Sequence, residues 1–246
     1  MVSRARDQGV TSMMVQIQIK DFVRQTMLRL AFGPMKARLI KGRPWMRQRE
    51  IWAIQNVLDH LRPERCLEWG TGFGTLHFAN RLGPSATWLS VEHDQGWAAS
   101  IRAQNTGNRA EILWAPPATP AERRNEDDAE DNLVYAARLQ DYVMAPRDRG
   151  PFDFILVDGR ARRNCFLQAL GWLAPGGVLA LHDANRPYLW DLQHHLAHSI
   201  HLTDYRDGEG GLLFGSQDRP VADWLDQEAA IRLWDWAKCH GALLRH

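Results

Sequence analysis

The sequence lacks the features that mark several large classes of protein. Its 246 residues include only three cysteines, Cys66, Cys165 and Cys239, which form neither a C-x-x-C pair nor an even disulfide framework. No apolar run approaches the roughly 20 residues that span a bilayer. Gln16 and Lys20 interrupt the apolar part of the N-terminal segment, so no signal peptide is indicated. We therefore expect reduced thiols and a cytoplasmic protein.

A surplus of charge of one sign is also missing. The formal net charge is +1, which gives no general attraction to nucleic acid or to membranes. The central part of the chain has no basic stripe and no N-P-P-Y-type element for a flipped base, which argues against a nucleic-acid substrate. Basic side chains gather in residues 13–49, where Asp21 is the single acid. This segment predicts an amphipathic helix that packs on the domain, covers an active site or makes peripheral contact with an anionic surface such as a membrane.

What the sequence does contain is a glycine turn between a strand and a helix. The stretch Arg65–Thr75 reads RCLEWGTGFGT, in which a short apolar strand ends at Glu68 and three glycines follow at alternate positions. Glycine lets the backbone approach a ligand closely, and the start of the next helix offers unpaired N–H groups. A dinucleotide fingerprint would need a glycine where Thr75 stands. The turn therefore predicts a nucleotide-type cradle of a different kind.

Strand and helix patterns alternate along the rest of the chain. The expected strands are Cys66–Glu68, Thr87–Glu92, Glu111–Trp114, Phe152–Val157 and Val178–His182, the last after a turn at Pro175–Gly177. The expected helices are Gln48–Leu61, Thr75–Leu82, Trp97–Gln104, Leu133–Val143, Arg163–Leu173, Tyr188–His198 and Val221–Lys238. Ile200–Tyr205 and Gly211–Phe214 predict a hairpin, and residues 118–132 predict a charged loop. Alternation of this kind favours an α/β fold with a parallel sheet and helices on both faces.

The pattern E-x-G-x-G-x-G resembles the first motif of the class I S-adenosylmethionine-dependent methyltransferases. Five strands followed by a hairpin are similar to the three-layer, Rossmann-like, seven-stranded sheet of that family, which closes with an antiparallel strand. The resemblance covers residues 48–216, with a basic helical extension over 1–47 and a C-terminal helix in 217–246. The elements LEWGTGFGT, VEHDQGW, VDGRARRNC and LHDANRPY resemble a mostly unassigned bacterial group within this family.

The resemblance implies a set of residues that bind S-adenosylmethionine. They are Glu68, Gly70, Thr71, Gly72, Phe73, Gly74, Glu92 and His93. Glu92 lies about 20 residues after the first glycine, where a carboxylate accepts hydrogen bonds from both ribose hydroxyls. Glu68 is expected near the methionine amino group and the glycine-loop amides near its carboxylate. Trp97 or Trp114 could stack on adenine or belong to the core.

Catalytic candidates come from two later strand ends. Methyl transfer is an in-line displacement, and a hydroxyl nucleophile benefits from a base or a metal ion. Asp158 is the first candidate because it follows an apolar strand that could raise its pKa, and Asp183 is the second. His182 reads either as a base or as a packed histidine. Asp158, Asp183 and Asn185 resemble the divalent-metal site of catechol-type O-methyltransferases, although Ala184 interrupts the usual Asp-Asn pair.

Three arginines, Arg160, Arg162 and Arg163, follow the first of these aspartates. They could bind an anionic group of a substrate through bidentate contacts, or they could pair with the acidic residues of 126–131. The sequence leaves both readings open.

The function that these patterns favour is O-methylation of a small-molecule or sugar-like acceptor by S-adenosylmethionine. One alternative is a nicotinamide-dependent oxidoreductase on a related sheet, against which the missing glycine and the closing hairpin argue. Another is a binding module that keeps the fold without catalysis. The oligomeric state and the identity of the acceptor have no signature in the sequence.

Overall fold

The computed structural model describes residues 42–118, 137–203 and 210–240. The protein divides into two compact units, Met1–Arg43 and Pro44–His246. The basic N-terminal segment up to residue 41, nearly all of the charged loop and the first part of the helix expected at Leu133–Val143 lie outside the described residues, as does most of the turn of the closing hairpin. Among the described residues, none of the helices has the length and apolar character that crossing a membrane requires.

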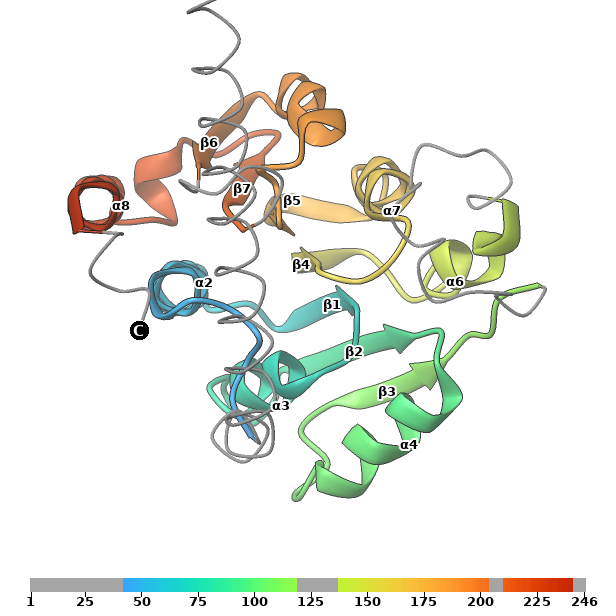
Figure 1. Cartoon of the computed structure of the whole chain (residues 1–246). Coiled ribbons are helices and arrows are strands. Elements are labelled where there is room, and N and C mark those ends of the chain that lie inside the picture. Colours follow the sequence, from blue (N-terminus) through green and yellow to red (C-terminus); the bar gives the residue numbers. More distant parts are fainter. Residues whose placement is uncertain (1–41, 119–136, 204–209, 241–246) are drawn as a thin grey trace, which may run out of the picture. The chain divides into compact units, whose positions relative to one another are not determined.

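Seven strands form a single sheet in the second unit (Figure 1). They are β1 (Arg65–Trp69), β2 (Thr87–Glu92), β3 (Glu111–Trp114), β4 (Phe152–Val157), β5 (Leu173–His182), β6 (His198–Leu202) and β7 (Leu212–Ser216). Their spatial order is β3-β2-β1-β4-β5-β7-β6. The first five run parallel, and β7 is antiparallel to both of its neighbours. The strand order reverses between β1 and β4, where such sheets open a crevice for ligands.

Helices cover both faces of this sheet, because alternate side chains of each strand are apolar and buried on opposite sides. One face packs against α2 (Gln48–Leu61), α3 (Phe73–Ala79) and α8 (Gln227–His240). The other packs against α6 (Gln140–Met144), α7 (Arg162–Ala169) and the 3₁₀ helix η2 (Pro187–His195). The helix α4 (Gln95–Gln104) lies against β2, β3 and α3, and the short η3 (Val221–Asp223) precedes α8. The predicted three-layer α/β fold is confirmed.

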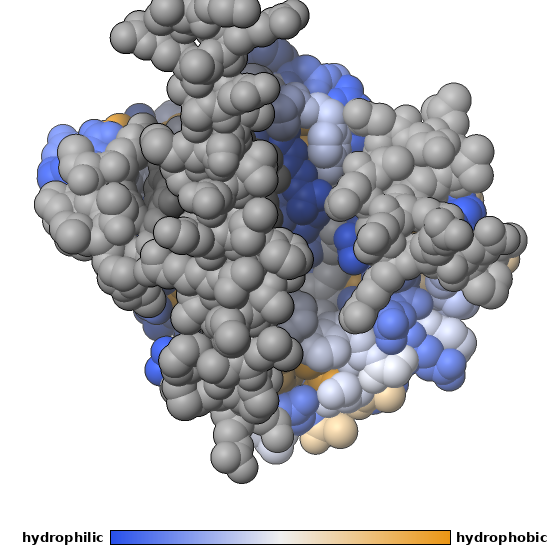
Figure 2. All heavy atoms as spheres, viewed as in Figure 1, coloured by the Kyte–Doolittle hydropathy of each residue, from blue (hydrophilic) through white to orange (hydrophobic). Residues whose placement is uncertain are grey.

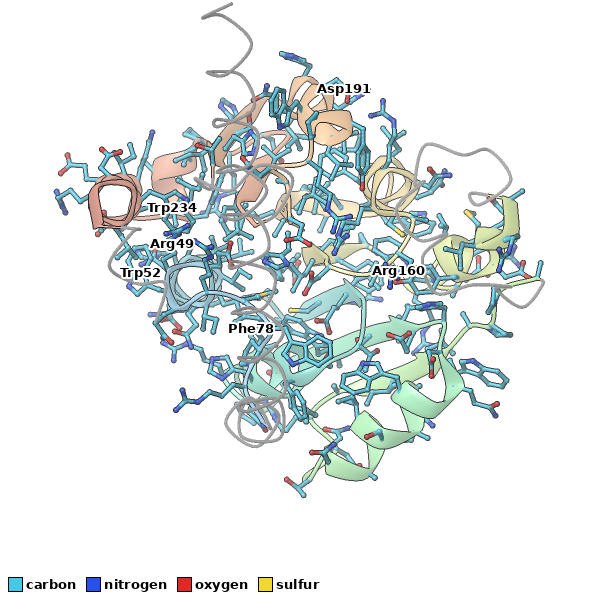
Figure 3. The ribbon with its side chains drawn as sticks, viewed as in Figure 1. Arg49, Trp52, Phe78, Arg160, Asp191 and Trp234 are labelled. Carbon is cyan, nitrogen blue, oxygen red and sulfur yellow. The ribbon has the colours of Figure 1, made fainter. Side chains whose placement is uncertain are left out.

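The C-terminal helix packs on the same layer as α2. The guanidinium group of Arg49 lies 5.2 Å from the ring centre of Trp234, and both side chains are buried. Figure 3 shows these two residues side by side, one on each helix. Aromatic faces attract cations, and a buried tryptophan removes a large apolar area from water. The helix α8 is thereby joined to the α2 layer.

Several elements after β4 differ from the predictions. The residues expected as a turn, Pro175–Gly177, belong to β5, which begins at Leu173 and shifts its register against β4 between Phe152 and Phe154. Gly176 has φ +76°, a conformation that glycine adopts readily, so the irregularity is absorbed inside the strand.

The segment expected as an α-helix at Tyr188–His198 is the 3₁₀ helix η2, and His198 begins β6 instead. Its buried residues Leu189 and Leu192 are three positions apart, a spacing that aligns on one edge of a 3₁₀ helix. The helix predicted at Arg163–Leu173 is likewise shorter and ends at Ala169. The last helix is divided into η3 and α8.

Candidate functional site

A cavity of about 810 Å³ opens at the carboxyl ends of β1, β2, β4 and β5. All of the predicted cofactor and catalytic residues line it: Glu68, Gly70, Thr71, Gly72, Phe73, Gly74, Glu92, His93, Asp158, His182 and Asp183. Asn185 does not line it. Figure 2 shows hydrophilic residues in the middle of this face, over the region where Figure 1 draws β5. The sheet edge therefore brings the sequence motifs together in one place.

The glycine turn after β1 contains glycines with two different roles. Gly70 has φ +102°, and a Cβ atom there would lie 2.6 Å from the carbonyl carbon and oxygen of Asp158. No other residue fits, so Gly70 lets the ends of β1 and β4 meet. Gly72 has extended backbone with φ −168°, and its Cβ would have no neighbour closer than 4.0 Å. Gly72 therefore leaves open space on the cavity wall.

Glu68 is buried beneath this turn, and only one of its oxygens is held by the protein. Its Oε2 accepts hydrogen bonds from the Thr75 hydroxyl (2.6 Å), the Ser90 hydroxyl (2.8 Å) and the Trp88 indole (2.9 Å). No hydrogen bond from the described residues reaches Oε1. Burial raises the pKa of Glu68 to about 7, although the three hydrogen bonds favour the ionised form. The carboxyl group therefore titrates near neutral pH, and Glu68 is among the residues that line the cavity.

Thr75 occupies the position where a dinucleotide fingerprint would have glycine. Its hydroxyl donates to Glu68 and accepts from the backbone N–H of Gly72 at 2.8 Å, and the side chain is fully buried. The departure from the dinucleotide pattern is therefore a structural link between the turn and the buried acid.

Glu92 ends β2 in a similar way. Its Oε1 accepts hydrogen bonds from the backbone N–H groups of His93 (2.9 Å) and Asp94 (2.8 Å) and lies 2.7 Å from Nδ1 of His93. Within the described part of the chain, Oε2 has no hydrogen-bond donor. The carboxylate is held through one oxygen, and Glu92 is among the residues that line the cavity.

Aromatic rings form the wall beside the glycine turn. Trp97 contacts Phe73 edge-on at 6.0 Å and Trp45 at 5.3 Å between ring centres, and all three line the cavity. Trp97 is half-buried and its indole donates to the carbonyl of Thr71 at 2.6 Å. Trp114 is 40% exposed and does not line the cavity. Trp97 also packs against the small core cluster of Ala98, Ile101 and Ile112, so it belongs both to the core and to the cavity wall, whereas Trp114 belongs to neither.

At the other end of the cavity, a histidine bridges two carboxylates. Nδ1 of His182 lies 2.6 Å from Oδ1 of Asp158, and Nε2 lies 3.3 Å from Oε2 of Glu50. Burial alone would lower the pKa of His182, but the charge of Asp158 and the hydrogen bonds to Asp158 and Glu50 outweigh it and raise the pKa to about 10. A histidine in this state donates from both nitrogens and has no lone pair with which to accept a proton.

Glu50, which contacts His182, and Arg186, which lines the cavity, are site residues that the sequence analysis missed. Glu50 is the more deeply buried of the two. It is 1% exposed and comes from the first turn of α2, where Oε2 also accepts from the N–H of Arg47 at 2.7 Å. Oε1 accepts from the N–H of Gly211 at 3.0 Å. The only local signal is its position on the apolar face of α2, four residues before the buried Ile54.

Asp183 is surrounded by cationic groups. Its Oδ2 lies 3.2 Å from Arg162 and 3.1 Å from Arg186, and Oδ1 accepts from the N–H of Gly210 at 2.8 Å. Burial would raise the pKa of Asp183, but the charges of His182 and Arg162 hold it at about 2. Its φ of +56° is rare for a residue with a side chain.

The predicted metal ligands do not fit a metal ion in this arrangement. One guanidinium nitrogen of Arg162 lies 3.2 Å from Asp183 and 3.6 Å from Asp158, so it sits between the two carboxylates that a bridging cation would need. Asn185 is buried outside the cavity lining. The described residues also contain no cluster of three or more His, Cys, Asp or Glu able to hold a metal.

The three arginines after β4 have separate positions. Arg163 forms a two-pronged ion pair with Asp191 on η2, at 2.7 and 2.6 Å, away from the cavity. Arg160, labelled in Figure 3, lines the cavity, as does Arg162. The acidic loop with which they could have paired lies outside the described residues.

Comparison with known proteins supports the fold. No family model matches the chain, and no curated protein matches its sequence. Among solved structures, an O-methyltransferase from Bacillus cereus in complex with SAH is 15% identical, covers 74% of this chain and 88% of its own, and has a TM-score of 0.51. A methyltransferase from Geobacter sulfurreducens is 13% identical over 76% of this chain and 90% of its own, with a TM-score of 0.50. A methyltransferase-like protein from Silicibacter pomeroyi is 21% identical over 78% and 96%, with a TM-score of 0.49.

The chain has the class I methyltransferase fold. The seven-stranded, mostly parallel sheet with its closing antiparallel hairpin is the predicted one, and the structure adds that β7 lies between β5 and β6. The site of this methyltransferase-fold protein divides into two ends. One end contains the glycine turn with Glu68 and Glu92, and the other contains Asp158, His182 and Asp183 with their arginines.

Proposed function

We propose that the protein is an S-adenosylmethionine-dependent methyltransferase that acts on an oxygen atom of a small-molecule or sugar-like acceptor. One observation carries the proposal. Glu68 and Glu92 flank the glycine turn, each is held through one oxygen, and each leaves the other oxygen without a hydrogen bond from the described residues. A buried carboxylate oxygen without a hydrogen-bond donor costs free energy in the protein without a ligand, and a bound ligand with donor groups removes that cost.

The donors of S-adenosylmethionine suit these two oxygens. Its ribose carries two hydroxyl groups for Glu92, and its methionine moiety carries an ammonium group for Glu68. The open space at Gly72 leaves room for a ligand against the turn. The aromatic wall of Trp97, Phe73 and Trp45 gives the apolar surface that most ligand sites contain.

S-adenosylmethionine supplies, when bound, a methyl group on a positively charged sulfur. Asp158 would act at the other end of the cavity as the residue that accepts the proton of the acceptor hydroxyl. Its Oδ1 is taken by His182, whereas Oδ2 has no hydrogen bond from the described residues. His182 would act as a positioning residue that fixes Asp158, because both of its nitrogens already face carboxylates. This assignment changes the role of His182 from base to orienting group.

Isothermal titration calorimetry with S-adenosylmethionine, SAH and NADH tests the cofactor. We expect both sulfur cofactors to bind at one site and NADH not to bind. Binding of NADH alone would instead favour the oxidoreductase. A screen of hydroxylated small molecules and sugars with radiolabelled S-adenosylmethionine then tests catalysis. Cofactor binding without transfer to any acceptor would favour the binding module.

A matched pair of variants tests the carboxylates. Glu92→Gln keeps an oxygen that accepts from the backbone but replaces the other by a donor, which opposes the ribose hydroxyls. We expect it to weaken SAH binding by about tenfold or more, which corresponds to about 1.4 kcal/mol. Glu111→Gln, on the exposed start of β3 outside the cavity, is the control and leaves the affinity unchanged.

A further inference from the structure

Two guanidinium groups converge on one carboxylate at the acceptor end of the cavity. Arg162 and Arg186 approach the same oxygen of Asp183 at 3.2 and 3.1 Å. Arg162 also reaches Asp158 at 3.6 Å and therefore bridges the ends of β4 and β5. Its side chain is only 8% exposed, so this bridge is a buried part of the fold and not a surface ion pair.

We propose that Arg162 and Arg186 take the place of a divalent cation at this end of the cavity, so that the acceptor's oxygen atoms are bound by guanidinium N–H groups and not by a metal ion. The proposal rests on the proposed function. A divalent cation between the two aspartates would meet the guanidinium of Arg162 at its own position, with like charges in contact. The space between Asp158 and Asp183 therefore holds either the guanidinium of Arg162 or a divalent cation, and not both.

Arg186 is the more exposed member of the pair. It lines the cavity, and its side chain is 21% exposed. Its Nη2 donates to Asp183 and its Nη1 to the hydroxyl of Tyr188 at 3.3 Å, whereas Nε is a buried donor without an acceptor in the described part of the chain. An unsatisfied buried donor beside a cavity fits an acceptor oxygen supplied by a ligand.

The chemistry of the donors defines the class of acceptor. A planar guanidinium binds carboxylate and phosphate oxygens through parallel hydrogen bonds, and it stays protonated at every physiological pH. Arg160 lines the same cavity and adds a further positive charge. We therefore expect an acceptor with an anionic group, a carboxylate or a phosphate, next to the oxygen that receives the methyl group.

Manganese binding tests the replacement of the metal. The wild-type protein, with and without saturating SAH, is titrated with Mn²⁺, and free Mn²⁺ is followed by electron paramagnetic resonance. We expect no specific site in the wild type. Arg162→Met removes the cation between two carboxylates, and we expect it to bind Mn²⁺ at least about tenfold more tightly. Adding Asp183→Asn to this variant removes the gain.

Arg163→Met is the matched control, because Arg163 is the next residue and pairs with Asp191 outside the cavity. It has no effect on Mn²⁺ binding if the proposal holds. Arg162→Lys keeps a cation and serves as the second variant should Arg162→Met fold poorly; it gains no Mn²⁺ site. A wild-type Mn²⁺ site that Asp183→Asn abolishes, or equal binding by the methionine variants at positions 162 and 163, overturns the proposal.

Small probes test the acceptor class separately. Benzoate and benzamide have similar shapes, but only benzoate is charged. In SAH-saturated protein, we expect benzoate to shift the Nε–H resonance of Arg186 in nuclear magnetic resonance spectra and benzamide to leave it in place; inorganic phosphate is the second anionic probe. Equal effects of benzoate and benzamide, or none from either anion, contradict the anionic acceptor. If SAH itself fails to bind, the proposed function fails, while the Mn²⁺ titration of the unliganded protein still tests the arginines.

Discussion

Gly70 lies so close to the backbone of Asp158 that position 70 has no room for a side chain. A Cβ atom at position 70 would lie 2.6 Å from the Asp158 carbonyl, and the N–H of Asp158 donates to the carbonyl of Trp69 at 2.9 Å. The cofactor end and the acceptor end of the cavity therefore share one backbone contact. The glycine turn therefore contributes to the stability of the fold as well as to the wall of the cavity.

Alanine substitutions at Gly70 and Gly72 separate these two effects. Gly70→Ala introduces strain at φ +102° and a backbone clash, and we expect it to lower the free energy of unfolding by about 1–3 kcal/mol or more. Gly72→Ala has extended backbone and no close neighbour, so its stability should stay within about 0.5 kcal/mol of wild type.

For ligand binding, we expect the substitution at Gly72 to have the clear effect that it lacks on stability. The added methyl group of Gly72→Ala projects into open space on the cavity wall, and we expect at least about a tenfold loss of SAH affinity. Urea denaturation measures stability, and calorimetry measures SAH binding. A stable Gly72→Ala variant with wild-type affinity would show that the ligand does not contact the turn there.

The buried acid Glu68 predicts a dependence of stability on pH. Its pKa in the folded protein is about 7, above the ordinary value of 4.5. The folded state therefore favours the protonated form, and the contribution of Glu68 to stability falls as pH rises from about 4.5 to about 7. Above that range, the ionised group costs about 3 kcal/mol. Glu68→Gln keeps an oxygen for Thr75, Trp88 and Ser90, so we expect it to be more stable than wild type at pH 8 and similar at pH 4.5 in denaturation experiments.

The same carboxyl group predicts an opposite effect on ligand binding. The ammonium group of SAH needs the ionised carboxylate, so the affinity of the wild type should fall by up to about tenfold per unit as the pH decreases below about 7. Glu68→Gln should bind SAH weakly at every pH in this range. A wild-type affinity that is constant between pH 5 and 8 would mean that Glu68 does not pair with the ammonium group.

Local sequence was enough to predict the elements that have a strong pattern of their own. The bounds of β2, β3, β4 and α2 agree with the prediction. The strands β2 and β4 are apolar runs that end at or just before an acid, β3 is a short apolar run followed by two prolines, and α2 has a single apolar face. Acids at strand ends were also informative, since the carboxyl ends of parallel strands share one edge. Glu68, Glu92 and Asp158 were found in this way.

Contacts between distant segments could not be predicted. Glu50 is 132 positions from His182 and 161 from Gly211, so nothing near it in the sequence indicates its partners. The position of Arg162 between Asp158 and Asp183 depends on how α7 leaves β4, which no local pattern encodes. For this reason the sequence left a metal site open at a place where the structure has an arginine.

Tryptophan fluorescence offers a direct test of where the ligand lies. Trp45 is 69% exposed on the cavity lining, with its ring 5.3 Å from that of Trp97. A ligand against the glycine turn would cover this pair, so we expect SAH to change the emission of the wild type. Trp45→Phe should lose most of that change. Trp190→Phe is the control, because Trp190 is 50% exposed but does not line the cavity. Equal changes in both variants would place the ligand away from Trp45.

The packing of α8 on α2 predicts that the C-terminal helix is required for stability. Trp234 is 3% exposed and meets the guanidinium of Arg49, so Trp234→Ala removes a large buried ring and a cation–π contact. We expect it to lower the free energy of unfolding by about 3–5 kcal/mol. Ile231 lies one helical turn earlier on α8 but is 43% exposed, and Ile231→Ala should cost less than about 1 kcal/mol. Urea denaturation of the two variants measures these losses, and equal losses would mean that α8 does not pack through the face that carries Trp234.

The same contact also predicts an effect on activity. Glu50 follows Arg49 on α2 and contacts His182, so loosening α8 should weaken the contact between Glu50 and His182. We expect Trp234→Ala to lower the rate of methyl transfer by the folded protein, whereas Ile231→Ala should leave it unchanged.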